Sequence, residues 1–373
     1  MLVIALCLNG STPAPGQTRN SAPADFAALA AGAEAARDAD RAGEAIALYR
    51  KAVALRPGWG EGWWSLAMLE YEGKAFRPAA EAFQKAAGLN PKNGLAWAML
   101  GLSEFELGQD ASALQHIQEG EGLGLPDDPQ LQHVVFYHEG VLLRRAGMFK
   151  EALRRLHALC FAGVHNPDLL QALGMVALWR AERGPADERD AEVVARVGRA
   201  ECLAGQKKFD EARQEYAAAA HDYPRYPNLH YAYGWFLLAA QDMPAGYAEL
   251  EQEIKNNPRN VMARLQIAAT RYKVDSAAGL PYAEEAVKLD PQLVLGHYVL
   301  GLLLLDTDNY LRAIPELETV QKARPRFAKV YLALGAAYAR AGREEDAARA
   351  RGNFQRFQQG ADKEPDLMPS PEQ

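Results

Sequence analysis

The sequence contains only three cysteines in 373 residues, Cys7, Cys160 and Cys202, and no two of them stand in a CxxC spacing. It therefore offers no cysteine-based zinc site. Cys160 and Cys202 each lie among apolar residues with a helical pattern, so a buried free thiol is the simplest interpretation of each. A disulfide between them stays open in case the protein is exported.

No apolar run reaches the ~18–20 residues that a transmembrane helix needs, so none is predicted. "LVIALCL", residues 2–8, is as short as the apolar part of a signal peptide can be, and no Lys or Arg precedes it. The "STPAPGQTRNSAPA" that follows is typical of a flexible linker. Two interpretations stay open: the remnant of a signal peptide on a periplasmic or secreted protein, or the unstructured leader of a cytoplasmic one.

A surplus of positive charge is also missing. The chain has 48 acidic and 41 basic residues, a net charge of -7, and no dense Lys/Arg run, so we predict no nucleic-acid partner. The HExxH, Walker A and GxSxG motifs are absent from the sequence. His133 and His138 are five residues apart, which does not place them on one helix face. The sequence therefore predicts no enzyme, no cofactor and no metal site.

What the sequence does contain is a repeat. Prolines recur after helical runs in two groups, within which the steps are 33 to 35 residues. The prolines are Pro57, Pro91 and Pro126, then Pro224, Pro258, Pro291 and Pro325. A small residue and then a bulky one recur before most of them: Ala45 and Tyr49, Ala79 and Phe83, Ala212 and Tyr216, Gly246 and Leu250, Ala313 and Leu317. Proline ends a helix, and small residues let helix backbones approach closely, so each unit is predicted to be two helices, A and then B.

This pattern resembles the tetratricopeptide repeat (TPR) family, whose units follow W-x2-L-G-x2-Y…A-x3-F…P. The best matching unit contains Trp63, Leu66, Ala67, Tyr71, Ala79, Phe83 and Pro91. Residues 97–117 and 331–338 match again. The resemblance implies an all-α fold, a TPR-type α-solenoid in which antiparallel helix pairs stack into a right-handed superhelix. No single unit can bury its apolar face, so stacking is required.

Departures from the period suggest a domain organisation. The step from Gly174 to Ala200 is only 26 residues, about one helix too short, and "RGPADERDAE" lies between them. We therefore predict a leader and linker at 1–25, a first TPR sub-array at 26–182, a junction at 183–192, a second sub-array at 193–358 and a disordered tail at 359–373. A helix B is predicted to be missing at the junction.

The resemblance also implies where a partner binds. In the family, a second stripe of each helix A lines the concave face, and here Trp64 and Met68 begin that stripe. The aligned residues are unusually apolar for an exposed surface, which is typical of a binding groove. The predicted groove residues are Trp64, Met68, Leu102, Tyr137, Val141, Met175, Tyr231, Trp235, Tyr298 and Leu302. The alternative is that tight winding covers these side chains, so that they belong to the core.

The function that the resemblance implies is a non-enzymatic scaffold for protein–protein interaction, which binds a partner segment in the groove. The stripe carries no Lys or Asn that could clamp an acidic C-terminus, so we expect a peptide with apolar anchors, with basic flanks in view of the net charge of -7. The alternative function is a receptor for a non-peptide ligand, a glycan or a lipid, in the same groove.

Overall fold

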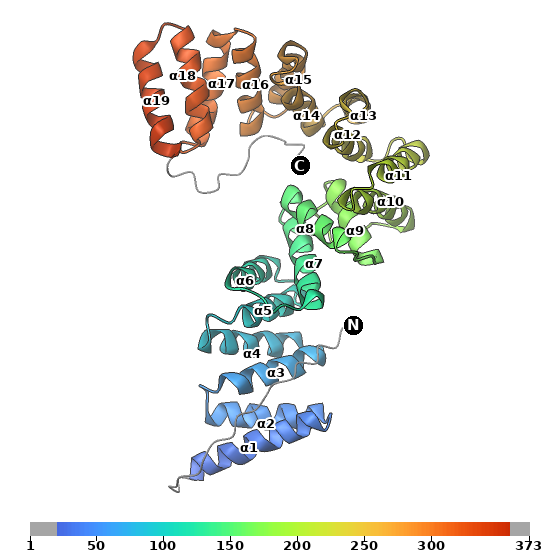
Figure 1. Cartoon of the computed structure of the whole chain (residues 1–373), viewed down its shortest axis with the longest axis vertical. Helices are drawn as coiled ribbons and strands as arrows, with labels where there is room; N and C mark the ends of the chain where they lie inside the picture. The colour runs from blue at the N-terminus through green and yellow to red at the C-terminus, as the bar shows by residue number, and fades with distance from the viewer. Residues whose placement is uncertain (1–20, 359–373) are drawn as a thin grey trace. The chain divides into compact units, whose positions relative to one another are not determined.

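The computed structural model describes residues 21–358, and within that range it consists of 19 helices and no strands (Figure 1). The chain divides into two compact units, residues 1–142 and 143–373, with the division inside α7. The predicted tail at 359–373 and most of the predicted leader lie outside the described residues. The first helix begins at Ser21, five residues before the predicted start of the array.

The first unit is built of helix pairs joined by short turns, and within each pair the two helices pack on each other. Its helices are α1 (Ser21–Asp38), α2 (Ala42–Leu55), α3 (Gly60–Glu72), α4 (Phe76–Leu89), α5 (Gly94–Glu106), α6 (Asp110–Leu123) and most of α7 (Pro129–Arg145). The pairs α1·α2, α3·α4 and α5·α6 stack in order, with α2 against α3 and α4 against α5.

The second unit continues the same construction with one irregularity near its start. Its helices are α8 (Phe149–Phe161), α9 (Pro167–Ala177), α10 (Glu188–Gly205), α11 (Phe209–Asp222), α12 (Leu229–Ala239), α13 (Met243–Asn256), α14 (Val261–Arg271), α15 (Ser276–Leu289), α16 (Val294–Asp306), α17 (Tyr310–Ala323), α18 (Ala328–Arg340) and α19 (Glu344–Gln358). From α10 onward the helices form regular pairs. The all-α solenoid fold predicted from the repeat is confirmed.

The bulky residue of each helix B lies in the core, as the repeat predicts. Tyr49, Phe83, Tyr216, Leu250 and Leu317 are all at most 1% exposed. The small residues beside them are buried too, and they allow the helices to pack closely. Every unit therefore buries its large side chains only by packing against neighbouring helices.

Besides packing, the residue at the position of Trp63 makes a hydrogen bond in several repeats. Five residues aligned there each donate a side-chain hydrogen bond to the carbonyl oxygen of the proline six residues earlier. The pairs are Trp63 with Pro57, Trp97 with Pro91, His230 with Pro224, His297 with Pro291 and Tyr331 with Pro325, at 2.7 to 3.0 Å. The donor fixes the turn that connects one repeat to the next.

The turn between helices A and B carries a residue with positive φ at each step, for example Lys74 (φ 58°) and Gly108 (φ 72°). Trp179, just after α9, has φ 57°, and the N–H of Arg180 donates to the carbonyl of Met175 as in the other turns. Thus α9 ends like a helix A. No helix B follows it: residues 178–187 are non-helical and lead directly into α10. The break begins and ends five residues before the predicted junction at 183–192.

Across this break α10 packs directly on α9. Gly174 and Gly198 lie where the two helices cross: a Cβ on Gly174 would stand 1.9 Å from the carbonyl oxygen of Val194, and one on Gly198 would stand 1.7 Å from that of Leu170. Only glycine fits at these two positions. The junction predicted at 183–192 falls inside the second compact unit. That it separates two sub-arrays stays a prediction.

A disulfide ties α8 to α10. It joins Cys160 to Cys202, which are 42 residues apart in the sequence and have Cα atoms 5.4 Å apart. The sequence left two alternatives open, buried free thiols or a disulfide, and the structure contains the disulfide. Beside the bond, His157 Nε2 lies 2.7 Å from Glu201 Oε2, so covalent and polar links both connect these two helices.

We expect reduction of this disulfide to destabilise the second unit by roughly 4 kcal/mol, because the bond closes a long loop and so restricts the unfolded chain. The measurement is guanidinium denaturation with and without a thiol reductant. A Cys160→Ala/Cys202→Ala variant is the control, since the reductant should leave its midpoint unchanged. Equal midpoints for reduced and oxidised wild type would contradict the expectation.

The geometry of His230 predicts a pH dependence. Its Nδ1 lies 2.6 Å from Glu249 Oε2, and its Nε2 lies 2.9 Å from the carbonyl oxygen of Pro224. Both partners accept, so the ring donates from both nitrogens only as the imidazolium. Burial alone would lower the pKa of His230, but the bonds to Glu249 and Pro224 outweigh it and raise the pKa above its ordinary value of 6.5.

A raised folded-state pKa stabilises the protein fully below the unfolded pKa, and the stabilisation is lost as the pH rises through the folded pKa. We therefore expect amide hydrogen exchange in α12 and α13 to quicken, after correction for intrinsic rates, as the pH is raised above 6.5, the ordinary pKa of histidine. His230→Gln should flatten this dependence. The exposed His221 supplies the control, and a His221→Gln variant that flattens it equally would count against the assignment.

The linker after α9 predicts a proteolysis pattern. Its Arg183 is exposed, but Asp190 holds the segment by accepting from Arg180 Nη1 at 2.5 Å and from the backbone N–H of Ala186 at 2.6 Å. Burial alone would raise the pKa of Asp190, but the hydrogen bonds from Arg180, Tyr226 and Ala186 lower it to about 2. The carboxylate is therefore ionised at neutral pH.

We expect trypsin to cut after Arg183 before it cuts inside any repeat, because exposed linkers are the preferred nicking sites. Asp190→Ala should speed this first cut by about threefold or more, since it frees the linker. Asp127→Ala, at an exposed carboxylate of the first unit, is the control. First cuts spread along the array, or equal rates for the two variants, would contradict this interpretation.

Candidate functional site

A groove of about 1250 Å³ opens between α8, α10, α11 and α12 in the second unit. We call it the α8–α12 groove. Its lining residues are Lys150, Glu151, Leu153, Arg154, His157, Ala158, Phe161, Glu201, Ala204, Gly205, Lys207, Phe209, Asp210, Arg213, Trp235, Phe236, Ala239, Ala240 and Gln241. A volume of this size accommodates a segment of several residues.

Apolar rings line much of this groove. Phe161 is 68% exposed and Phe209 is 49% exposed, which is unusual for phenylalanine. Trp235 is partly buried, and Phe236 beside it is buried. An exposed set of rings within a concavity is typical of a surface that binds a partner.

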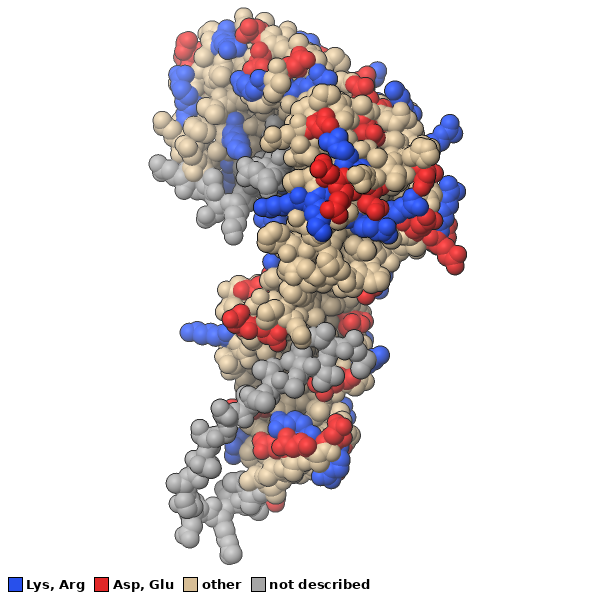
Figure 2. All heavy atoms as spheres, turned by 45° about the vertical axis from the view of Figure 1, so that its right-hand side comes forward, with Lys and Arg blue, Asp and Glu red and all other residues tan. Residues whose placement is uncertain are grey.

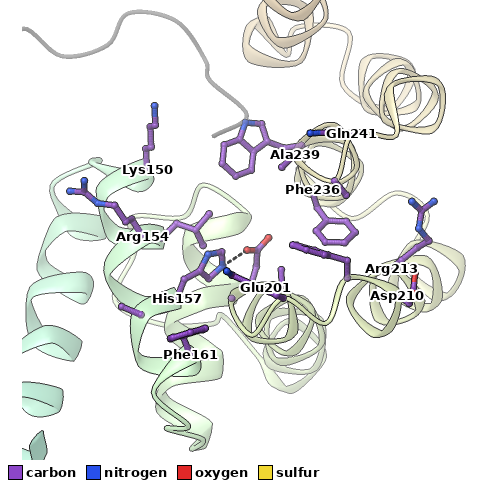
Figure 3. A pocket seen from close by; sticks show the side chains of 18 of the residues that line it. Lys150, Arg154, His157, Phe161, Glu201, Asp210, Arg213, Phe236, Ala239 and Gln241 are labelled. Atoms are coloured by element: carbon purple, nitrogen blue, oxygen red, sulfur yellow. Dashed lines mark hydrogen bonds and ion pairs between the residues drawn. The ribbon is translucent and has the colours of Figure 1, made fainter. Parts of the chain in front are cut away.

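The walls of the groove carry charged side chains. Figure 3 shows Lys150, Arg154, His157 and Phe161 projecting from α8 on one side, and Asp210 and Arg213 on the opposite side. Arg213 is engaged outside the groove by Asp242, with Nη1 2.8 Å from Oδ2. Lys207 lies over the ring of Phe161, with Nζ 5.9 Å from its centroid.

At the floor of the groove Glu201 is held by two side chains. Its Oε2 pairs with His157 Nε2, as the dashed line in Figure 3 shows, and its Oε1 accepts from the hydroxyl of Tyr216. Glu201 is 3% exposed. Burial, and then the charge of Glu201, hold the pKa of Tyr216 well above its ordinary value of 10. Tyr216 therefore stays protonated and donates to the carboxylate.

Sequence reasoning missed a further aromatic cluster in this unit. Trp179 stacks on Phe149 with ring centroids 5.3 Å apart and meets the ring of Tyr231 edge-on at the same distance. Trp179 is 39% exposed. The residues of α8, a helix B, were missed as well, because the resemblance directs attention to helix A. The short 26-residue step was the one signal that the packing around α8 to α10 departs from the regular repeat.

Six of the ten predicted groove residues are buried: Leu102, Val141, Met175, Tyr231, Tyr298 and Leu302, at 1% to 8% exposure. They pack on neighbouring helices; for example, the ring of Tyr298 lies edge-on to that of Phe327 at 5.0 Å. For these six the alternative that winding covers the stripe describes the structure. They cannot contact a partner without rearrangement.

The other four predicted residues, Trp64, Met68, Tyr137 and Trp235, are partly exposed. Trp235 lines the α8–α12 groove. Trp64 and Met68 line a small apolar pocket of about 40 Å³ in the first unit, which we call the α3–α7 pocket. Its other lining residues are Leu95, Met99, Pro126, Asp128 and Leu131. Whether these four residues bind a partner stays a prediction.

The surface gives few other indications of chemistry. On the face drawn in Figure 2, acidic and basic side chains are interspersed and form no broad field of one sign. Among residues 21–358, no cluster of three His, Cys, Asp or Glu side chains is arranged to hold a metal ion. In the same range, no helix combines the length and apolarity needed to cross a bilayer.

Comparison with known proteins gives the family. The tetratricopeptide repeat family model matches residues 65–124, 197–261 and 298–352. No curated protein matches the chain significantly.

Several solved structures are similar at a distance. A fragment of MamA from Desulfovibrio magneticus RS-1 is 18% identical and has a TM-score of 0.43, over 46% of this chain and 98% of that one. Yeast Tom70 is 13% identical with a TM-score of 0.30, over 91% and 93%. YrrB, described as a TPR protein with an unusual peptide-binding site, is 18% identical with a TM-score of 0.30, over 58% and 95%.

The three matched regions contain the helix pairs, buried small residues and left-handed turns described above. The first region lies in the first compact unit and the other two lie in the second. The chain belongs to the tetratricopeptide repeat family.

Proposed function

We propose that this protein is a non-enzymatic scaffold that holds a segment of a partner protein in the α8–α12 groove. The observation that carries the proposal is the exposure of Phe161 and Phe209 inside a concavity of about 1250 Å³. Burying these rings against a partner releases water from apolar surface, which is the main driving force for association. Trp235, on α12, offers a third ring for the same contact.

The α3–α7 pocket supports the same function as an additional anchor point. Its walls are nearly all apolar, and the thioethers of Met68 and Met99 can adapt to the side chain that enters. Its volume of about 40 Å³ has room for the end of one aliphatic side chain. Each of the two sites, taken by itself, suits an apolar anchor of a partner protein.

The test is affinity capture with the whole chain as bait, followed by titration of the captured partner in purified form. Trp235→Ala should weaken binding by about tenfold or more, as aromatic anchors at the centre of an interface do. The matched control is Leu311→Ala, because Leu311 is also an apolar residue at the surface, 69% exposed, but lies on α17 away from the groove.

The titration is repeated at low and high ionic strength to separate apolar from charged contacts. A partner whose affinity is unchanged by Trp235→Ala but falls strongly with salt binds another surface, and this outcome would refute the proposal. Loss of binding with Leu311→Ala as well would show that the interaction does not depend on the groove.

A further inference from the structure

The free charges of the α8–α12 groove are mostly positive. Within residues 21–358, Lys150, Arg154 and Lys207 have no carboxylate at ion-pair distance, and all three line the groove. The opposing unpaired carboxylates are Glu151 and Asp210. The remaining lining charges already have partners: Arg213 is paired with Asp242, and Glu201 is hydrogen-bonded to His157 and Tyr216.

The distribution of these charges matters more than their sum. Lys150 and Arg154 are one helical turn apart on α8, and Figure 3 shows them together on one wall. Of the two carboxylates, Glu151 is also on α8, whereas Asp210 lies on the opposite wall. Lys207 adds a cation next to Phe161. An extended acidic segment that follows the α8 wall therefore meets three cations against one carboxylate, Glu151, beside exposed phenyl rings.

The rings add a second requirement. Flat aromatic faces in a groove bind proline rings and aliphatic side chains of extended segments, because polyproline conformation is preformed and presents its rings at little entropic cost. Phe161, Phe209 and Trp235 are the rings available in the groove. A ligand that matches the groove thus combines acidic residues, prolines and an apolar anchor.

The chain itself contains a segment with all three features. Residues 360–373 read "GADKEPDLMPSPEQ" and follow α19 in the sequence. They include four acidic residues, Asp362, Glu364, Asp366 and Glu372, against one basic residue, Lys363. Leu367 and Met368 provide the apolar anchor, and Pro365, Pro369 and Pro371 surround it.

We propose that residues 360–373 dock in the α8–α12 groove of the same chain and occupy it until a partner displaces them. With Leu367 and Met368 seated at the rings, the tether is residues 359–366, which span up to about 30 Å when fully extended. A tether that bridges this span raises the local concentration of the segment to about the millimolar range. Weak contacts then suffice for occupancy. This inference deepens the proposed function, because the segment and the partner compete for one groove.

The test uses a synthetic peptide of residues 360–373 with a fluorescent label, titrated against the full chain and followed by anisotropy. A variant with Asp362→Asn, Glu364→Gln and Asp366→Asn has a weakened segment and an open groove. It should bind the labelled peptide about tenfold more tightly than wild type does, because no tethered competitor remains.

Adding Lys150→Glu and Arg154→Glu to this variant should weaken peptide binding by about tenfold or more, since the α8 wall then repels the acidic residues. Arg77→Glu and Lys85→Glu form the control, because these two exposed cations of α4 lie in the first unit and the change in charge is the same. Circular dichroism checks folding, and Lys150→Gln with Arg154→Gln replaces the reversal if that variant unfolds.

Three results would overturn the proposal: equal peptide affinity for wild type and the variant with the weakened segment, no binding to that variant, or binding that survives the changes on α8. Light scattering adds a fourth, a wild-type dimer that the weakened segment abolishes, since the segment would then bind a second copy. None of these four results would contradict the proposed function, because that function is tested separately by the effect of Trp235→Ala on binding of an external partner.

Discussion

The α8–α12 groove depends on the direct packing of α10 against both α8 and α9. Because no helix lies between α9 and α10, the backbones cross at Gly174 and Gly198, where no side chain fits. The disulfide from Cys160 to Cys202 then fixes α8 beside α10. The part of α8 that lines the groove carries Lys150, Arg154 and Phe161.

The repeat itself was predictable because each part of it has a local physical cause. A helix B ends near its proline, a small residue marks each close approach, and a bulky residue such as Phe83 or Leu250 fills the space between helices. The missing helix was predictable from the 26-residue step alone. Its bounds were not, since the five-residue shift of the linker depends on the turn at Trp179 and the contacts of Asp190.

The binding surface was harder to predict, because burial depends on how neighbouring repeats wind. Tyr231 and Tyr298 have the same place in their repeats as Trp64, yet they are buried and Trp64 is not fully so. Residue identity also hides equivalent roles. Trp63, His297 and Tyr331 differ in chemistry, but each places a ring and a donor against the same proline carbonyl. A hydrogen-bond donor recurs at this position of the repeat, although the residue type differs.

Charge shows most clearly how local structure changes an expectation drawn from composition. A net charge of -7 suggests a partner with basic flanks, but a ligand responds to the charges within about a Debye length of its site. In the groove the carboxylate of Glu201 is buried, and both of its oxygens are already hydrogen-bonded, to His157 and to Tyr216. By contrast, within residues 21–358, Lys150 and Arg154 have no carboxylate at ion-pair distance. An acidic protein can in this way present a groove that favours an acidic segment.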